Sequence, residues 1–198
     1  MPALRWRLRS FNEADAQQLN ESLHISPLLC RLLAQRGINT YDDARQFFRP
    51  ELNSLHDPFQ MRDMDAAVER LSRAVQRGER ILLYGDYDVD GATSVAMLYS
   101  FLSNFCKNLD YYLPDRDKEG YGVSLAGVEY ARNSGATLVV AMDCGIKAHR
   151  AVELASSYGI DFIICDHHLP DETLPTAVAV LDPKRADVIV AGVIVLHN

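Results

Sequence analysis

Three aspartates on alternate residues are the feature of this sequence that points most clearly to chemistry. The segment GDYDVDGATS contains Asp86, Asp88 and Asp90 and directly follows the apolar run 81–84. Carboxylates held so close repel one another, and a hard divalent cation such as Mg²⁺ or Mn²⁺, which prefers oxygen ligands, would relieve that repulsion. Asp and Gly are also ordinary loop residues, so the alternative is a polar loop with an aspartate capping the next helix.

Charged or metal-competent residues follow three further apolar runs in the same way. The tripeptide Pro-Asp-Arg at 114–116 follows the run 109–113, Asp143 follows 138–142, and the tripeptide Asp-His-His at 166–168 follows 162–165. In open parallel sheets, ligands bind beyond the carboxyl ends of the strands. Four runs that end this way predict one composite site at a single edge of a sheet.

The residue types in this site favour phosphoryl chemistry. Carboxylates with one or two imidazoles suit Mn²⁺, or Mg²⁺ with lower preference, and two ions about 3.5–4 Å apart would generate hydroxide and stabilise an in-line displacement. Zinc fits less well because the cysteines are not at a ligand spacing. The sequence has neither a Walker A loop nor a dinucleotide-binding glycine fingerprint. Ser94 lacks an identifiable triad, so acyl transfer is unsupported.

The helices and strands that must position these residues are predicted to form an α/β fold. From residue 80, apolar runs, with a fifth at 178–181, alternate with helical patterns at about 92–106, 124–134 and 148–158. This alternation predicts a parallel β-sheet with helices on both faces. A helix from Asp65 to Arg77 should precede it, with Asp65 as N-cap and Gly78 after its end.

The first 60 residues have a different texture and predict a small helical N-terminal segment with a connector, residues 1–60, ahead of a main domain of residues 61–198. Helical periodicity follows Ser26 and Pro27, and Gly37 is a plausible stop. Thr40 is placed to cap a second short helix over 41–48, and 52–59 would be the connector.

Composition bounds the class of protein. With 198 residues, 48% of them hydrophobic and 24% charged, the chain resembles an ordinary soluble globular protein. No apolar run reaches the roughly 20 residues that span a bilayer, and the N-terminus lacks a signal-peptide core, so we expect no membrane association and a cytoplasmic location. The net charge of −7 weighs mildly against binding nucleic acid through a basic surface alone. The scattered cysteines predict reduced thiols: Cys30, Cys106, Cys144 and Cys165.

Four motifs in a fixed order carry a resemblance to a known family. GDYDVDGATS, PDRDKEGYG, MDCG and CDHHLP together resemble the DHH phosphoesterase superfamily, and within it the single-strand-specific 5′→3′ DNA exonucleases of repair and recombination. The likeness covers about residues 60–185. It implies a metal-dependent phosphodiesterase that takes Mn²⁺ or Mg²⁺, two ions in the complete enzyme, and acts on single-stranded DNA. A single-strand-binding protein or a helicase would be the partner by the same resemblance.

The resemblance also implies a set of metal ligands. Asp88, Asp90 and Asp143 correspond to ligating carboxylates, with Asp143 as the bridging one, and His167 corresponds to the imidazole ligand. Asp86 occupies an acidic position near the metals and is counted with them.

Catalytic and substrate-binding roles follow from the same resemblance. His168 corresponds to the residue that contacts the scissile phosphate or assists its protonation, and Asp166 would orient a neighbouring imidazole. Arg116 would contact a substrate phosphate; a surface salt bridge is the alternative. The remaining substrate-binding candidates, whose alternatives are turn and helix-cap roles, are Gly120, Gly122, Thr93 and Ser94.

The sequence departs from the family toward its end. The family's last ligating aspartate, its DHHA1 domain and its OB-fold have no counterpart, so we expect a domain truncated before its end that binds the second ion weakly and has little nuclease activity. The apolar tail 188–196 predicts self-association. Two alternatives stay open: a phosphoesterase for short oligonucleotides, cyclic dinucleotides or pyrophosphate, whose members usually carry a histidine where this chain has Tyr84, and a non-catalytic remnant.

Overall fold

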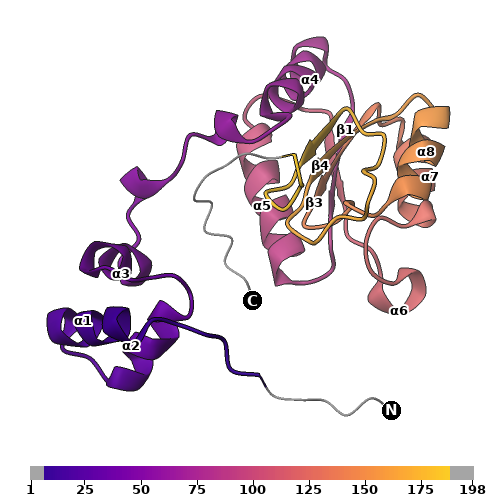
Figure 1. Cartoon of the computed structure of the whole chain (residues 1–198). Coiled ribbons are helices and arrows are strands. Elements are labelled where there is room, and N and C mark those ends of the chain that lie inside the picture. Colours follow the sequence, from indigo (N-terminus) through magenta and orange to yellow (C-terminus); the bar gives the residue numbers. More distant parts are fainter. Residues whose placement is uncertain (1–6, 188–198) are drawn as a thin grey trace, which may run out of the picture. The chain divides into compact units, whose positions relative to one another are not determined.

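A computed structural model describes residues 7–187. The chain divides into two compact units, and the boundary along the sequence falls between His56 and Asp57. The first unit is helical (Figure 1). It contains α1 (Glu13–Leu23), α2 (Pro27–Ala34), α3 (Tyr41–Phe48) and the short 3₁₀ helix η1 (Leu52–Ser54). Thr40 caps α3 as expected, because its side chain accepts a hydrogen bond from the Asp43 amide.

Helix α1 was not expected from the sequence. Its segment EADAQQLNESL is mostly polar, and only Ala16 and Leu19 are buried. Asn12 begins the helix by accepting a hydrogen bond from the Ala14 amide. The apolar side chains of the three helices share a small core, made of Ala16, Leu19, Cys30, Leu33, Ala34 and Ala44.

The second unit is built on a five-stranded parallel sheet, which confirms the α/β class. The strands are β1 (Ile81–Gly85), β2 (Leu109–Tyr112), β3 (Leu138–Met142), β4 (Asp161–Cys165) and β5 (Ala179–Leu181), in the spatial order β2-β1-β3-β4-β5. Tyr84 pairs with Ala141, which in turn pairs with Ile164. This register brings the carboxyl ends of β1, β3 and β4 level at one edge.

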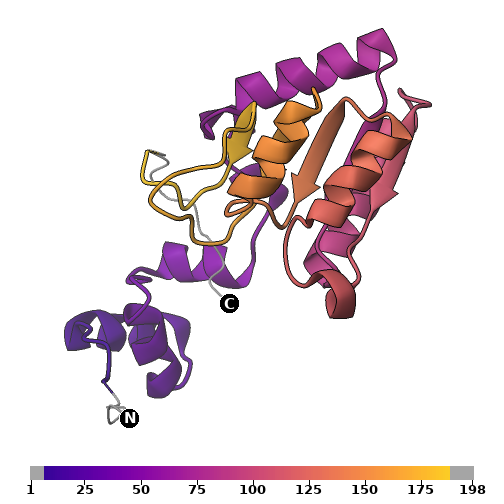
Figure 2. The same ribbon diagram turned by 90° about the vertical axis from the view of Figure 1, so that its right-hand side faces the viewer.

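Helices cover both faces of this sheet (Figures 1 and 2). Helices α4 (Met64–Arg77) and α5 (Val89–Leu102) pack on one face, and α7 (Leu125–Ser134) and α8 (His149–Ser157) on the other. Two short elements complete the unit, η2 (Pro58–Gln60) before α4 and α6 (Arg116–Glu119) after β2.

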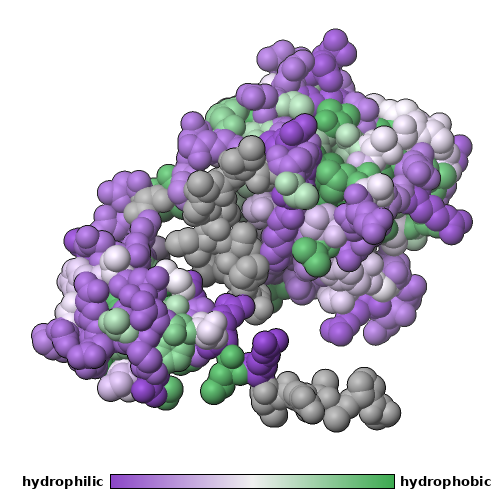
Figure 3. Space-filling model, in the orientation of Figure 1, coloured by the Kyte–Doolittle hydropathy of each residue, from purple (hydrophilic) through white to green (hydrophobic). Residues whose placement is uncertain are grey.

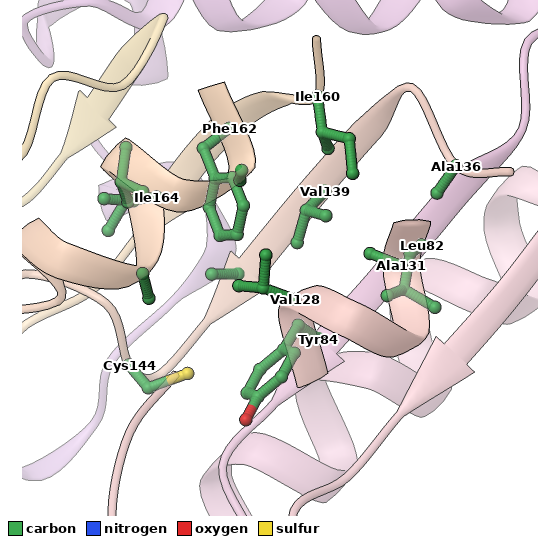
Figure 4. Packing of buried hydrophobic residues seen from close by; sticks show 14 of the residues in the cluster. Leu82, Tyr84, Val128, Ala131, Ala136, Val139, Cys144, Ile160, Phe162 and Ile164 are labelled. Atoms are coloured by element: carbon green, nitrogen blue, oxygen red, sulfur yellow. The ribbon is translucent and has the colours of Figure 1, made fainter. Parts of the chain in front are cut away.

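The core explains the continuous apolar runs. Successive strand residues point to opposite faces, and here both faces are covered, so every residue of β1 and of β3 is buried. Figure 4 shows Tyr84, Val139 and Phe162 packed with residues of α7 on one side of the sheet.

Two helix starts differ from the sequence-based expectation. Helix α5 begins at Val89 rather than near residue 92, because the side chain of Asp88 accepts hydrogen bonds from the amides of Asp90 and Gly91. Helix α4 begins at Met64 with Asp63 as N-cap, so the expected cap at Asp65 is wrong; Asp65 lies in the first turn.

The cysteines within residues 7–187 form no disulfide. No helix in that range is long and apolar enough to span a bilayer. Figure 3 shows hydrophilic residues over most of the visible surface, with hydrophobic patches on the sheet-containing unit. The thiols are free, with Cys30, Cys106 and Cys144 buried and Cys165 partly exposed.

Candidate metal centre

The candidate residues lie where the strands end. Asp86, Asp143 and Asp166 directly follow β1, β3 and β4. The amide of Asp143 donates to the Cys165 carbonyl at 2.8 Å, and the amide of Asp166 donates to the Leu181 carbonyl at 2.9 Å. The strand pairing therefore continues past the last sheet residue, and it fixes the backbone of both aspartates.

Two glycines let α5 approach the end of β1. A Cβ at Gly91 would lie 2.4 Å from the backbone nitrogen and oxygen of Asp86, and one at Gly85 would lie 2.6 Å from the Val95 side chain. The first turn of α5 thus packs directly on the Asp86 backbone, which only glycine permits. This contact holds Asp88, the cap of α5, beside Asp86.

Two overlapping groups of side chains could hold a metal ion. Oxygens of Asp86, Asp88 and Asp143 lie within 4.8 Å of one another, and so do ligand atoms of Asp143, His167 and His168. Asp143 belongs to both groups. Its backbone takes a left-handed conformation with φ of 61°, which non-glycine residues rarely adopt and which clusters at functional sites.

The electrostatics of the acidic group favour a cation. Burial, aided by the charge of Asp88, raises the pKa of Asp143 to about 6. Burial also raises the pKa of Asp86, and its Oδ1 atom is buried without a hydrogen-bond partner among the described residues. Asp143 Oδ1 lies 3.0 Å from His167 Nε2. Buried carboxylate oxygens beside an imidazole fit Mn²⁺ or Mg²⁺.

Asp166 fixes the histidine pair. Its Oδ1 accepts hydrogen bonds from the amides of His167 at 2.7 Å and His168 at 3.1 Å, and lies 2.7 Å from Nδ1 of His168. Its Oδ2 accepts from the Ile146 amide at 2.9 Å. Burial alone would raise the pKa of Asp166, but these hydrogen bonds hold that pKa below its usual value. The structure therefore pairs an ionised Asp166 carboxylate with Nδ1 of the His168 ring.

Asp90 and Ser94 approach the centre from α5. Both line a cavity of about 430 Å³ together with Asp143 and His167. Asp90 is exposed and belongs to neither of the two ligand groups. Of the acidic group, Asp143 borders this cavity, and α5 forms part of the cavity wall.

The loop between β2 and α7 carries Arg116. The guanidinium of Arg116 lies 5.2 Å from the centre of the Tyr87 ring. In the sequence, Tyr87 stands between Asp86 and Asp88 of the first motif. Asp115 pairs with Lys118 at 2.8 Å. Arg116 is exposed, so its charge is open to solvent.

The other substrate-binding candidates take local roles in the backbone. Gly120 and Gly122 have positive φ angles of 78° and 86°, and the space beside them is open. The Thr93 hydroxyl donates to the Val89 carbonyl at 2.6 Å within α5. These contacts fit the turn and helix roles, and the open glycine backbone leaves room for a ligand.

Sequence reasoning did not foresee the contacts that Tyr121 and Glu119 make near the centre. The Tyr121 hydroxyl lies 2.9 Å from Nδ1 and 3.1 Å from Nε2 of His168, and Glu119 makes hydrogen bonds inside the same loop. A second cavity of about 490 Å³ lies beside Tyr121, Ile146 and His168. Both residues stand in the PDRDKEGYG motif, which was the available signal.

Comparison with known proteins identifies the family. The model of the DHH family, N-terminal domain, matches residues 80–197, and the chain belongs to this family. Among curated proteins it is similar to the single-stranded-DNA-specific exonuclease RecJ of Bacillus subtilis, with 37% identity over 182 residues. It is 41% identical over 165 residues to RecJ of Escherichia coli. These matches cover 92% and 82% of this chain but 23% and 28% of the relatives, so the chain spans about a quarter of their length.

Two solved structures show the same fold. The crystal structure of exonuclease RecJ bound to manganese has a TM-score of 0.61 and 30% identity, over 67% of this chain and 34% of that one. RecJ from Thermus thermophilus in complex with Mn²⁺ has a TM-score of 0.65 and 25% identity, over 93% of this chain and 26% of that one.

Proposed function

We propose that this chain is the metal-binding part of a single-stranded-DNA-specific 5′→3′ exonuclease, a phosphodiester hydrolase of DNA repair and recombination. The observation that carries the proposal is the overlap of the two ligand groups on Asp143. A carboxylate shared by two ligand sets is what a pair of neighbouring cations needs. The RecJ relatives, named as single-stranded-DNA-specific exonucleases, support the substrate class.

The proposed cofactor is Mn²⁺, or Mg²⁺, as two ions in the complete enzyme. Asp86, Asp88 and Asp143 with His167 would hold them, and Asp90 would contribute from the cavity wall. Bound there, the ions would activate a water molecule and neutralise the developing charge on the phosphate. Asp143, which belongs to both ligand groups, would be the carboxylate that the two ions share.

The chain's own residues would position the phosphodiester. We propose that His168, held by Asp166, contacts the scissile phosphate or supplies a proton to the departing oxygen. Arg116 would bind a phosphate of the incoming strand. The turn at Gly120 and Gly122 and the start of α5 at Thr93 and Ser94 would border the strand's path.

Hydrolysis of 5′-phosphorylated single-stranded DNA in the presence of Mn²⁺ tests the proposal. We expect slow release of mononucleotides by the wild-type chain, in keeping with the little nuclease activity expected from its sequence, and none by Asp143→Ala. Asp117→Ala, an exposed acid on α6, removes the same charge and should retain activity. Hydrolysis confined to dinucleotides would support a phosphoesterase for short substrates instead, and no hydrolysis at all would support a non-catalytic module.

Further expectations from the sequence remain proposals. They are the division into a helical segment 1–60 and a DHH domain 61–198, a cytoplasmic location, and association with a single-strand-binding protein or a helicase. Self-association through the tail 188–196 falls outside the described residues. Analytical ultracentrifugation of the full chain over a range of concentrations would test that last expectation.

A further inference from the structure

The loop over residues 113–124 touches the candidate centre at two places. Arg116 lies over the ring of Tyr87, which stands between Asp86 and Asp88 in the sequence. Tyr121 contacts the ring of His168. The position of this loop therefore sets where two side chains lie relative to the metal ligands: Arg116, whose charge could bind a phosphate, and Tyr121, which contacts His168.

Glu119 holds the loop from inside. Its Oε1 accepts a hydrogen bond from the Asp115 amide at 2.8 Å. Its Oε2 accepts from the Tyr112 hydroxyl at 2.9 Å and from the Ser124 hydroxyl. These partners belong to the start of the loop, the end of β2 and the start of α7. Burial alone would raise the pKa of Glu119, but the hydrogen bonds hold that pKa below its usual value, so the group is an ionised acceptor.

A tyrosine pair supports the same loop from the sheet. The Tyr84 hydroxyl donates to the Gly122 carbonyl at 3.1 Å and accepts from the Ser124 amide at 3.1 Å. Its ring stacks on that of Tyr112 with 5.3 Å between centroids. Burial raises the pKa of Tyr84 to about 12, so its hydroxyl stays protonated and able to donate. Through Tyr112 and Ser124, Glu119 belongs to one network with the ends of β1 and β2.

We propose that Glu119 is a positioning residue for phosphodiester binding, which acts by fixing Arg116 against the first motif and Tyr121 against His168. The inference rests on the proposed function and adds to it the residue that sets the substrate loop. Glu119 contacts none of the candidate metal ligands in the hydrogen bonds above. Its loss should therefore weaken substrate binding and leave metal binding intact.

A double-mutant cycle on the full chain tests this role. The affinity of a 5′-phosphorylated phosphorothioate oligothymidine is measured with Mn²⁺ for the wild type, Glu119→Gln, Arg116→Ala and the double variant. Glu119→Gln keeps the shape of the side chain, but one acceptor becomes an amide that cannot accept. We expect each single variant to bind about tenfold more weakly, equivalent to about 1.4 kcal/mol, and the double variant to lose clearly less than the product of the two single losses, because part of the effect of Glu119 is carried by Arg116.

Two further measurements separate positioning from general damage. The Mn²⁺ affinity of Glu119→Gln, measured by calorimetry, should equal that of the wild type. Its Asp115 amide should exchange with solvent faster, while the amide of Val140 in β3 keeps its protection. Asp117→Asn is the matched control, because it removes the same charge from an exposed position on α6.

Several results would overturn the inference alone. They are wild-type affinity in Glu119→Gln, losses that multiply in the double variant, a parallel loss of Mn²⁺ affinity, and unchanged exchange at Asp115. A wild-type chain that binds no oligonucleotide would instead overturn the proposed function, and this inference with it. The wild-type measurement therefore distinguishes the two failures.

Discussion

Asp143 joins a strained backbone to a crowded electrostatic environment. Its backbone is left-handed, and its carboxylate lies near Asp88 and His167. The pKa of Asp143 is raised because burial and the charge of Asp88 disfavour its ionised form. Asparagine tolerates the same backbone conformation, so Asp143→Asn isolates the charge.

We expect Asp143→Asn to lower Mn²⁺ affinity by at least about tenfold, since changes in outer-shell partners alone cost tenfold or more. Without metal the variant should be as stable as the wild type or more so, because a repelling charge is gone. Thermal unfolding with and without Mn²⁺ checks both points. A variant that Mn²⁺ stabilises as strongly as the wild type would contradict them. The same titration counts ions, expected from the sequence to be one tight and one weak.

Asp166 offers a test of orientation rather than of charge. In Asp166→Asn the amide group must face at least one of the donors from Ile146, His167 and His168. We expect hydrolysis to slow by about 10–100-fold, as for other partners that orient metal-site histidines. Steady-state rates with Mn²⁺ in excess provide the measurement. Rates within twofold of the wild type would mean that the histidine does not depend on this carboxylate.

Sequence reasoning brought most of the centre together, and it ranked Asp88 and Asp90 above Asp86 as metal ligands. It placed Asp88, Asp143 and His167 at one edge, where the structure has them within ligand distance of neighbours. It treated Asp90 as equal to Asp88, whereas Asp90 lies in neither group. The reason is local: Asp88 caps α5 and Asp90 enters the first helical turn, so the alternating geometry of a strand no longer applies.

At the scale of elements, the contact between α5 and β1 depends on one missing side chain. Gly91→Ala would push a Cβ into the Asp86 backbone, and overpacking of this kind costs about 1–3 kcal/mol. We expect the free energy of unfolding to fall by that amount and Mn²⁺ binding to weaken, because Asp86 and Asp88 are displaced. Chemical denaturation and calorimetry provide the readouts.

Ser100→Ala gives the control for this substitution, since it adds no atoms at an exposed position of the same helix. Its free energy of unfolding should stay within about 0.5 kcal/mol of the wild type. Equal stability of Gly91→Ala and the wild type would show that the helix can shift without cost.

A buried arginine joins helix α4 to the amino ends of the strands, at the end of the sheet opposite the candidate centre. Arg70, 5% exposed, donates to Glu79 at 2.7 Å and to the Thr137 carbonyl at 3.3 Å, and also pairs with Asp161. Burial alone would raise the pKa of Glu79, but Arg70 and Thr137 hold that pKa below its usual 4.5.

This shift predicts a pH dependence with a definite sign. Because the pKa of Glu79 is lower in the folded chain, its stabilisation is fully present above pH 4.5 and is lost as the pH falls through the folded value. Glu79→Gln should lower stability at pH 7 and flatten the acid part of the curve. Denaturation midpoints between pH 7 and pH 3 would show this. Parallel curves for both proteins would contradict it.

Helices and strands whose apolar residues recur regularly or in continuous runs could be predicted from the sequence, whereas elements without such a pattern could not. The strands and α4 follow continuous or periodic apolar residues, whereas α1 buries only Ala16 and Leu19 and gave no signal. The helix α6, four residues long, has a polar sequence and depends on Asp115 as its cap. Packing against partners far along the chain decides such elements.

On the scale of the whole molecule, the candidate centre belongs to one unit. The residues proposed for metal and substrate, from Asp86 to His168, lie in the unit that begins at Asp57. We therefore expect a chain of residues 57–198 to bind Mn²⁺ with the affinity of the full chain. Calorimetry on both chains tests this, and a marked loss in the shorter chain would show that the helical unit contributes to the centre.

The sequence predicted the α/β class but not the order of the strands. Alternating strands and helices require a parallel sheet, yet several orders satisfy that pattern. The observed order places β3 between β1 and β4, and so sets Asp143 between the first motif and the histidine pair. Only the three-dimensional arrangement shows why Asp143 is shared.

The same strand order has a consequence for synthesis of the chain. A nascent polypeptide that has completed β1 and β2 can pair them, but the other edge of β1 stays open until β3 emerges. An open edge can pair with other chains, so the interval before β3 is the stage most exposed to aggregation. The centre cannot assemble until β4 has also paired, which makes Mn²⁺ binding a reporter of completed folding.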